Sequence, residues 1–285
     1  MKKVLATLIL IAVLIGCSAG TNQTKLTPTN DDGTRLVLNK ADLKNGDQHL
    51  NHAETFGKYA EGFNHFILQG IDIVQKSAMD GGGYFIGLKA DPPESPIGYD
   101  LKLFNKELLK APRTTSYCSG SSYSAFVEAL NLIFKNKFQN LSDDRYEALR
   151  MQELDGSRRN DGIKYWGKWN DNGYGNHFAL VQYSGMGKQI KPINARPGDF
   201  LNISWKSGNG HSVIFLGWCI DKDGDKCLAY WSSQKGTDGL GDQVVKLSRI
   251  EEVMFVRLTN PEKLFTFDAN KEVISKVKGD VIDWE

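Results

Sequence analysis

The sequence lacks the features that mark a nucleic-acid-binding or membrane-spanning chain. Its 285 residues carry a formal net charge of +1 and include no long basic tract, so nothing favours nucleic acid as a partner. The apolar run from Val4 to Ile15 is shorter than the roughly 20 residues that a helix needs to cross a bilayer. Cysteine is also scarce, with four residues that are expected to divide into unequal roles. The 40% hydrophobic content nevertheless predicts a substantial core.

The N-terminus is predicted to be an export signal. Met1-Lys2-Lys3 is a short positive region, the apolar run follows, and Leu14-Ile15-Gly16-Cys17 comes next. This pattern resembles the signal of bacterial lipoproteins, which is cut before the cysteine that takes the lipid. The resemblance implies a signal peptide over 1–16, lipidation of Cys17 and a lipid anchor in a membrane. Ser18 after that cysteine implies the outer membrane, facing the periplasm; a generic signal peptide cut nearby is the alternative.

The rest of the chain is expected to be a tether and a single domain. Residues 17–50 are rich in Thr, Asn, Asp, Lys and Gly, which predicts a tether between the lipid and a domain over 51–285. Apolar spacing predicts a helix from Glu54 to Lys76. Three histidines lie in or before it without an evident ligand set, so neither a metal site nor a cofactor is predicted: His49, His52 and His65.

A candidate nucleophile stands where a polar turn runs into a helix. The turn begins at Thr114, and after Gly120 the apolar residues follow helical spacing through Phe134. Cys118 is therefore predicted at a helix N-terminus, where free backbone N–H groups and the helix dipole favour a thiolate. A buried hydrophobic cysteine is the alternative. The serine- and glycine-rich neighbours favour an accessible, activated sulfur.

A candidate base lies on the following sheet. Phe200–Trp205 and His211–Trp218 are predicted strands joined by a glycine-rich turn, which puts His211 at the mouth of a buried strand. A histidine there can reach a sulfur on an abutting helix terminus while its ring stays partly solvated. A structural histidine is the alternative for His211 taken alone. Its pairing with Cys118 favours the functional interpretation.

Three motifs in order resemble the NlpC-type cell-wall cysteine peptidases of the papain-like superfamily: Tyr117-Cys118-Ser119-Gly120, Arg196-Pro197-Gly198-Asp199-Phe200, and Gly210 to Gly217 beginning Gly-His-Ser. The resemblance covers roughly 113–234 and implies an α+β, papain-like fold with the cysteine helix packed on an antiparallel sheet. It further implies Cys118 as nucleophile, His211 as general base and amide bonds of peptidoglycan stem peptides as substrate. The family usually has Asp before the cysteine, where this chain has Tyr117.

The residue that orients the imidazole is expected on the strand Leu228–Gln234. If Cys219 pairs directly with Cys227, side-chain alternation puts Trp231 and Ser233 on the face of His211. A bulge would move Ser232 or Gln234 there instead. Ser233 is therefore the first candidate and Gln234 the second.

A long loop over 155–176 and a hairpin complete the predictions. Aromatic residues in the polar loop favour a substrate-binding rim, with packing onto the domain as the alternative. The candidate substrate contacts are Arg113, Tyr117, Trp166 and Trp169, with Tyr117 also a candidate second oxyanion donor. Cys219 and Cys227 flank a turn whose Asp-Gly spacing does not fit a calcium loop, and in an exported protein they are expected to form a disulfide.

The sequence therefore predicts a cysteine hydrolase that cleaves peptidoglycan amides through a thioacyl-enzyme. Two alternatives stay open. One is an acyltransferase or lipid-amide hydrolase on the same scaffold. The other is a catalytically silent, wall-binding lipoprotein, which the missing His, Asn or Asp in Leu228–Gln234 suggests.

Overall fold

The computed structural model describes residues 35–39, 41–43, 46–85, 98–110, 114–135, 141–155, 157, 159, 165–166, 174–272 and 277–284. The predicted signal peptide, Cys17, Arg113 and Trp169 lie outside these ranges. Within them, no helix combines the length and the apolar character that crossing a membrane requires.

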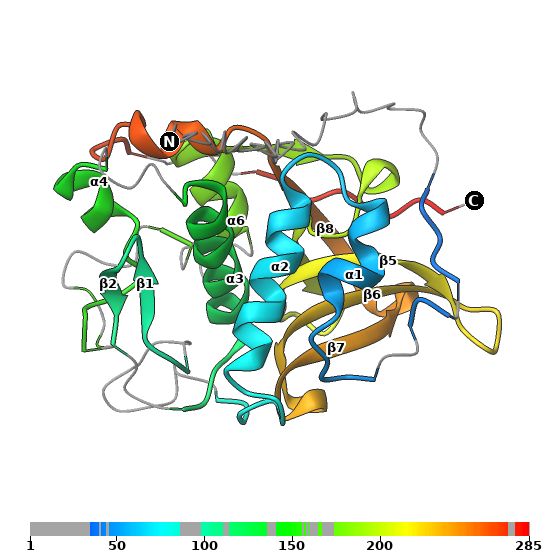
Figure 1. The fold of residues 1–285 in the computed structure, drawn as a ribbon. Helices are drawn as coiled ribbons and strands as arrows, with labels where there is room; N and C mark the ends of the chain where they lie inside the picture. Colours follow the sequence, from blue (N-terminus) through cyan, green and yellow to red (C-terminus); the bar gives the residue numbers. More distant parts are fainter. Residues whose placement is uncertain are drawn as a thin grey trace, which may run out of the picture.

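The centre of the fold is an antiparallel sheet of six strands in the order β3-β8-β4-β5-β6-β7 (Figure 1). Both faces carry apolar side chains, and each face is covered by its own hydrophobic cluster. The strands are β3 (Gly187–Ile190), β4 (Phe200–Trp205), β5 (Gly210–Ile220), β6 (Lys226–Gln234), β7 (Gly239–Lys246) and β8 (Ile250–Leu258). β5 is buried along nearly its whole length, as a strand covered on both faces must be.

Helices cover one face of this sheet (Figure 1). They are α1 (His52–Phe56), α2 (Asn64–Lys76) and α3 (Cys118–Ile133), and α2 lies against α3. The two helices approach closely at Gly70, where an added Cβ would stand 2.3 Å from the carbonyl oxygen of Ala125. The single helix predicted over 54–76 is interrupted, because Gly62 adopts a φ of +56° that an α-helix cannot contain.

Smaller elements surround the two main layers. A hairpin of β1 (Leu101–Leu103) and β2 (Lys106–Leu109) packs on α3. The remaining helical segments are α4 (Asp143–Ala148), α6 (Gly175–His177), the π-helix Phe178–Tyr183 and the short 3-10 turns Gly57–Tyr59, Pro192–Asn194, Lys235–Thr237, Leu247–Arg249 and Pro261–Phe265. The chain is therefore of the α+β class.

The last part of the predicted tether belongs to the domain. Leu38 is 5% exposed, and its N–H donates to the carbonyl oxygen of Trp218 at 2.7 Å. Val37 forms a parallel bridge with the same tryptophan. The prediction of a tether reaching residue 50 is therefore wrong for its described part, because a few apolar residues in a polar stretch are enough to dock it on the sheet.

The Pro-Gly-Asp turn is anchored by a buried ion pair. Asp199 is fully buried, and Arg257 on β8 donates to it from Nε and Nη2, each at 2.7 Å. Asn64 of α2 donates to the same carboxylate at 2.8 Å, and so does the backbone N–H of Arg196. Because the bidentate pair joins the turn to β8 and the Asn64 bond joins it to α2, together they fix where β4 begins and therefore where β5 lies beside it.

Candidate active site

The candidate site lies where the sheet opens between β5 and β6. These strands pair from the hairpin up to Ile214 and Trp231. Beyond that pair, residues 210–213 pair with β4 and residues 232–234 pair with β7, and no β5–β6 pair joins these described residues. We call this gap the sheet opening.

Serine hydroxyls of the first turns of α3 fill the sheet opening. Ser121 Oγ accepts the backbone N–H of Ser233 at 3.1 Å and lies 3.3 Å from Ser232 Oγ. Ser122 Oγ lies 2.9 Å from Ser212 Oγ on β5. The start of α3 is thus bonded to both separated strands, which brings the cysteine turn and the histidine strand to the same end of the sheet.

Cys118 is the first residue of α3, as predicted, and Tyr117 is the extended N-cap residue. Backbone N–H groups of Ser212 and Ser119 favour the thiolate, but burial outweighs them and raises the pKa of Cys118 to about 11. The side chain is 5% exposed. The prediction of an accessible, activated sulfur is therefore wrong, because the neighbouring Ser116 and Ser121 bond to the buried Ser233 and not to solvent.

His211 directly precedes Ser212, whose hydroxyl oxygen lies 2.9 Å from Ser122 Oγ on α3. Its ring packs edge-on against Tyr230, with 5.5 Å between ring centroids, and it is 8% exposed. Burial lowers the pKa of His211 to about 4, and its Nε2 has no hydrogen-bond partner. The partly solvated ring expected from the sequence is therefore not found, and both members of the candidate pair are neutral at pH 7.

Gln234, and not Ser233, is the neighbour of the imidazole. Cys219 stands opposite Cys227, as assumed, but the register shifts by one residue between Phe215 and Gly217. This bulge exchanges the faces along the rest of β6. Ser233 consequently faces α3, where its hydroxyl donates to the carbonyl oxygen of Ser116 at 3.0 Å. The prediction that Ser233 orients the imidazole is therefore wrong, and Gln234, the second candidate, lies beside the ring instead.

The carboxamide of Gln234 is held in a definite orientation. Its Nε2 donates to Thr237 Oγ1 and, at 3.1 Å, to the carbonyl oxygen of Gly241. The remaining oxygen, Oε1, favours the protonated form of His211 against the effect of burial on its pKa. That oxygen has no partner with hydrogen-bond geometry, so the contact with the ring is looser than a full hydrogen bond.

The described candidates for substrate binding are packed residues. Trp166 is fully buried, donates from Nε1 to Ser122 Oγ at 3.0 Å and stacks on Phe126. It belongs to the core, so the prediction that it lies on an exposed rim is wrong. Tyr117 is 7% exposed. Tyr165 and Trp166 pack on Phe126 of α3, and Trp166 also packs on Phe200 of β4, which composition alone did not distinguish from a binding surface.

A cavity of about 320 Å³ lies beside the N-terminal half of α3. Ser116, Gly120 and Ser121 form one wall, and the segment Asp80 to Gly82 contributes to the other. Cys118 and His211 do not line it. Of the two serines that fill the sheet opening, Ser121 lines this cavity, so the cavity reaches the start of α3 but not the sulfur.

Cys219 and Cys227 stand directly opposite each other across the β5–β6 hairpin. Both are buried free thiols in this structure. Opposed positions in an antiparallel pair have a Cα separation that a disulfide can bridge, so the disulfide stays a prediction for the exported protein.

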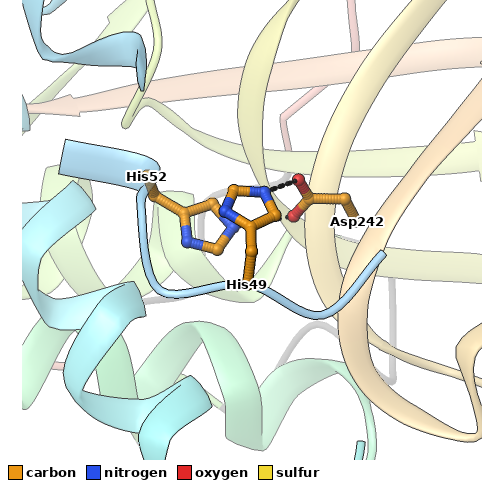
Figure 2. A group of neighbouring side chains, drawn as sticks. All are labelled: His49, His52 and Asp242. Atoms are coloured by element: carbon orange, nitrogen blue, oxygen red, sulfur yellow. Dashed lines mark hydrogen bonds and ion pairs between the residues drawn. The ribbon is translucent and has the colours of Figure 1, made fainter. Parts of the chain in front are cut away.

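A second polar cluster was missed by sequence reasoning. His49, His52 and Asp242 converge at the edge of the sheet (Figure 2). His49 lies at the end of the predicted tether and His52 just before the predicted helix, whereas Asp242 lies far along the chain on β7. A His-x-x-His spacing was the signal available in the sequence, but the third member came only with the fold.

Comparison with known proteins finds no family model that matches the chain. It also finds no curated protein and no solved structure with detectable similarity. The proposals below therefore depend on the site and on the sequence motifs.

Proposed function

We propose that the chain is a cysteine hydrolase with a papain-like, NlpC-type arrangement, which cleaves an amide bond through a thioacyl-enzyme. The observation that carries this proposal is the contact of Ser122 Oγ on the cysteine helix with Ser212 Oγ on the histidine strand, 2.9 Å apart. It brings the cysteine motif and the histidine motif to the same end of the sheet. The oriented carboxamide of Gln234 beside His211 supplies a third polar group, as hydrolases of this kind require.

In the proposed reaction His211 accepts the proton of Cys118, and the thiolate attacks the carbonyl carbon of the substrate. The tetrahedral oxyanion forms at the start of α3, where the backbone N–H of Cys118 can donate to it. The amine leaves with the proton from His211, which produces a thioester on Cys118. Water, deprotonated by His211, then releases the acid and restores the thiol.

We propose the peptide stems of peptidoglycan as substrate class and the periplasmic face of the outer membrane as location. The order of the three motifs supports the substrate. The sequence Leu14-Ile15-Gly16-Cys17 supports export and attachment through a lipid on Cys17. A protein attached there through a lipid on Cys17 would have the cell wall within reach.

The neutral pair sets a condition on this mechanism. Burial raises the pKa of the Cys118 thiol and lowers the pKa of His211, so proton transfer from the thiol to the imidazole is costly in this structure. Much of that cost comes from burial, because both groups are cut off from water. Substrate or water must therefore enter beside Cys118 and His211 before the thiolate can form.

The experiment is peptide release from purified murein, followed by chromatography and mass spectrometry. Cys118→Ala and His211→Ala are expected to abolish release, while the matched control Cys227→Ser retains it. Gln234→Ala is expected to lower kcat and to change KM little, because the carboxamide positions the imidazole and does not bind substrate. Unchanged peptide release from Cys118→Ala would end the assignment.

A catalytically silent, wall-binding lipoprotein is the second candidate, and the buried neutral pair favours it. Alkylation by iodoacetamide separates the two candidates, since the thiolate is the reactive form. An enzyme is expected to show Cys118 alkylation that accelerates when murein peptides are added. A silent binder is expected to show binding to murein with Cys118 alkylated more slowly than a free thiol, with or without peptides.

A further inference from the structure

The cluster of His49, His52 and Asp242 has the geometry of a ligand set. Nε2 of His49 lies 2.8 Å from Asp242 Oδ2, and Nε2 of His52 lies 2.8 Å from Asp242 Oδ1 (Figure 2). The two rings stack with 4.1 Å between centroids. One ligand atom from each residue fits within 4.8 Å of the others, so a single ion could touch all three.

The ligand atoms are held in place by other groups. Nδ1 of His52 lies 2.6 Å from Asp72 Oδ1 on α2, which turns Nε2 toward Asp242. The carboxylate of Asp72 is itself fixed by the backbone N–H groups of His52 and Ala53, at 2.9 and 3.0 Å. A carboxylate behind a ligating histidine is the usual support of a metal-bound imidazole.

Burial separates this cluster from an ordinary surface charge pair. His52 is fully buried and His49 is 7% exposed, while the carboxylate of Asp242 is 18% exposed. A small cavity of about 70 Å³ adjoins the cluster and is lined by His49 and Asp242. It has room for a water molecule or a small ligand beside the two residues.

We propose that His49, His52 and Asp242 bind one divalent transition-metal ion, with water from the adjoining cavity at an open fourth position. Two imidazole nitrogens and one carboxylate oxygen suit zinc, and three protein ligands with an open position are typical of reactive zinc sites. The inference does not depend on the cysteine hydrolase proposal, since none of its ligands belongs to the sheet opening.

Protons hold the cluster together when the metal is absent. Both nitrogens of His52 face carboxylate oxygens, which accept hydrogen bonds, so metal-free His52 carries two protons. The ion displaces the one on Nε2 to solvent. His49, whose Nδ1 accepts the Asn51 N–H at 3.2 Å, moves its single proton from Nε2 to Nδ1, and that long contact opens.

The test is zinc titration of the full chain by calorimetry after removal of metal with EDTA. The Cys219→Ser, Cys227→Ser background removes the facing thiols, which could otherwise bind zinc. One ion per chain is expected. His49→Ala and Asp242→Asn should each raise Kd at least about 100-fold, and Asp72→Asn about 10- to 100-fold. The exposed His65 provides the control, since His65→Ala should leave Kd unchanged.

Thermal unfolding gives a second measurement. Zinc at about 100 times Kd should raise the Tm of the parent by roughly 5–10 °C and leave the Tm of His49→Ala unchanged. Because His49 lies in a loop, His49→Ala is the variant that decides the test if the other variants do not fold. No saturable zinc binding, or equal binding by the His49→Ala variant, would show that the cluster is a hydrogen-bonded support only and would overturn the proposal.

Discussion

Replacement of Asp199 by Asn tests whether the Pro-Gly-Asp turn is fixed by its charge. In the native chain this carboxylate accepts two hydrogen bonds from Arg257, which is 5% exposed. Removing one charge of a buried pair typically costs about 3–5 kcal/mol, because the other charge stays desolvated. Arg257 keeps Glu61 as a partner, which places the expected loss near the lower end, at about 3 kcal/mol.

The assay is urea unfolding followed by circular dichroism, with the free energy of unfolding extrapolated to water. Asp238→Asn, at an exposed turn, is the matched control and should change stability by less than about 0.5 kcal/mol. Combining Asp199→Asn with Arg257→Met removes both charges and should cost less than the sum of the single changes. A loss below about 1 kcal/mol for Asp199→Asn, or strict additivity in the double variant, would refute this reasoning.

Three further predictions concern packing and pH. Folding lowers the pKa of His211 from its ordinary value of 6.5 to about 4, so between these pH values the unfolded chain binds a proton at His211 and the folded chain does not. The free energy of unfolding should therefore fall by up to about 3 kcal/mol as the pH is lowered from 6.5 to 4. Urea unfolding of His211→Asn across the same range should lack this contribution. Gly70→Ala should cost about 1–3 kcal/mol, because its Cβ meets the backbone of α3, whereas Ile73→Ala on the same helix should cost less; equal losses in thermal unfolding would count against close α2–α3 packing. Trp166→Ala should cost about 3–5 kcal/mol in the same assay, and a loss under 1 kcal/mol would restore its interpretation as a rim residue.

The elements that the sequence predicted well are those whose pattern is local. Strand β4 has the predicted bounds, and α3 begins at the predicted cysteine. In both cases the signal is the spacing of apolar residues next to a turn, which depends on a few neighbouring positions. Long-range pairing between β5 and β6 could not be read in this way, because one extra residue in a bulge reverses which side chains share a face.

Burial of polar residues was the other property that the sequence concealed. The serines around Cys118 suggested a solvated turn, yet Ser121 and Ser122 are buried and hydrogen-bonded. Serine satisfies its hydroxyl with whatever donor or acceptor lies nearby, so its presence does not distinguish water from protein as the partner. The same uncertainty applies to Trp166, whose indole found its acceptor inside the core.

Hydroxyl groups join α3 to the separated ends of β5 and β6, and this gives the joint a property that a strand ladder does not have. A backbone N–H can only donate, so a ladder that shifts must break. A hydroxyl can rotate and exchange donor for acceptor, as Ser121 with Ser232 and Ser122 with Ser212 are able to do. The helix that carries the sulfur is therefore joined to the sheet in part by contacts whose donor and acceptor can exchange, and a small shift at this joint is one way for a ligand to reach the closed thiol.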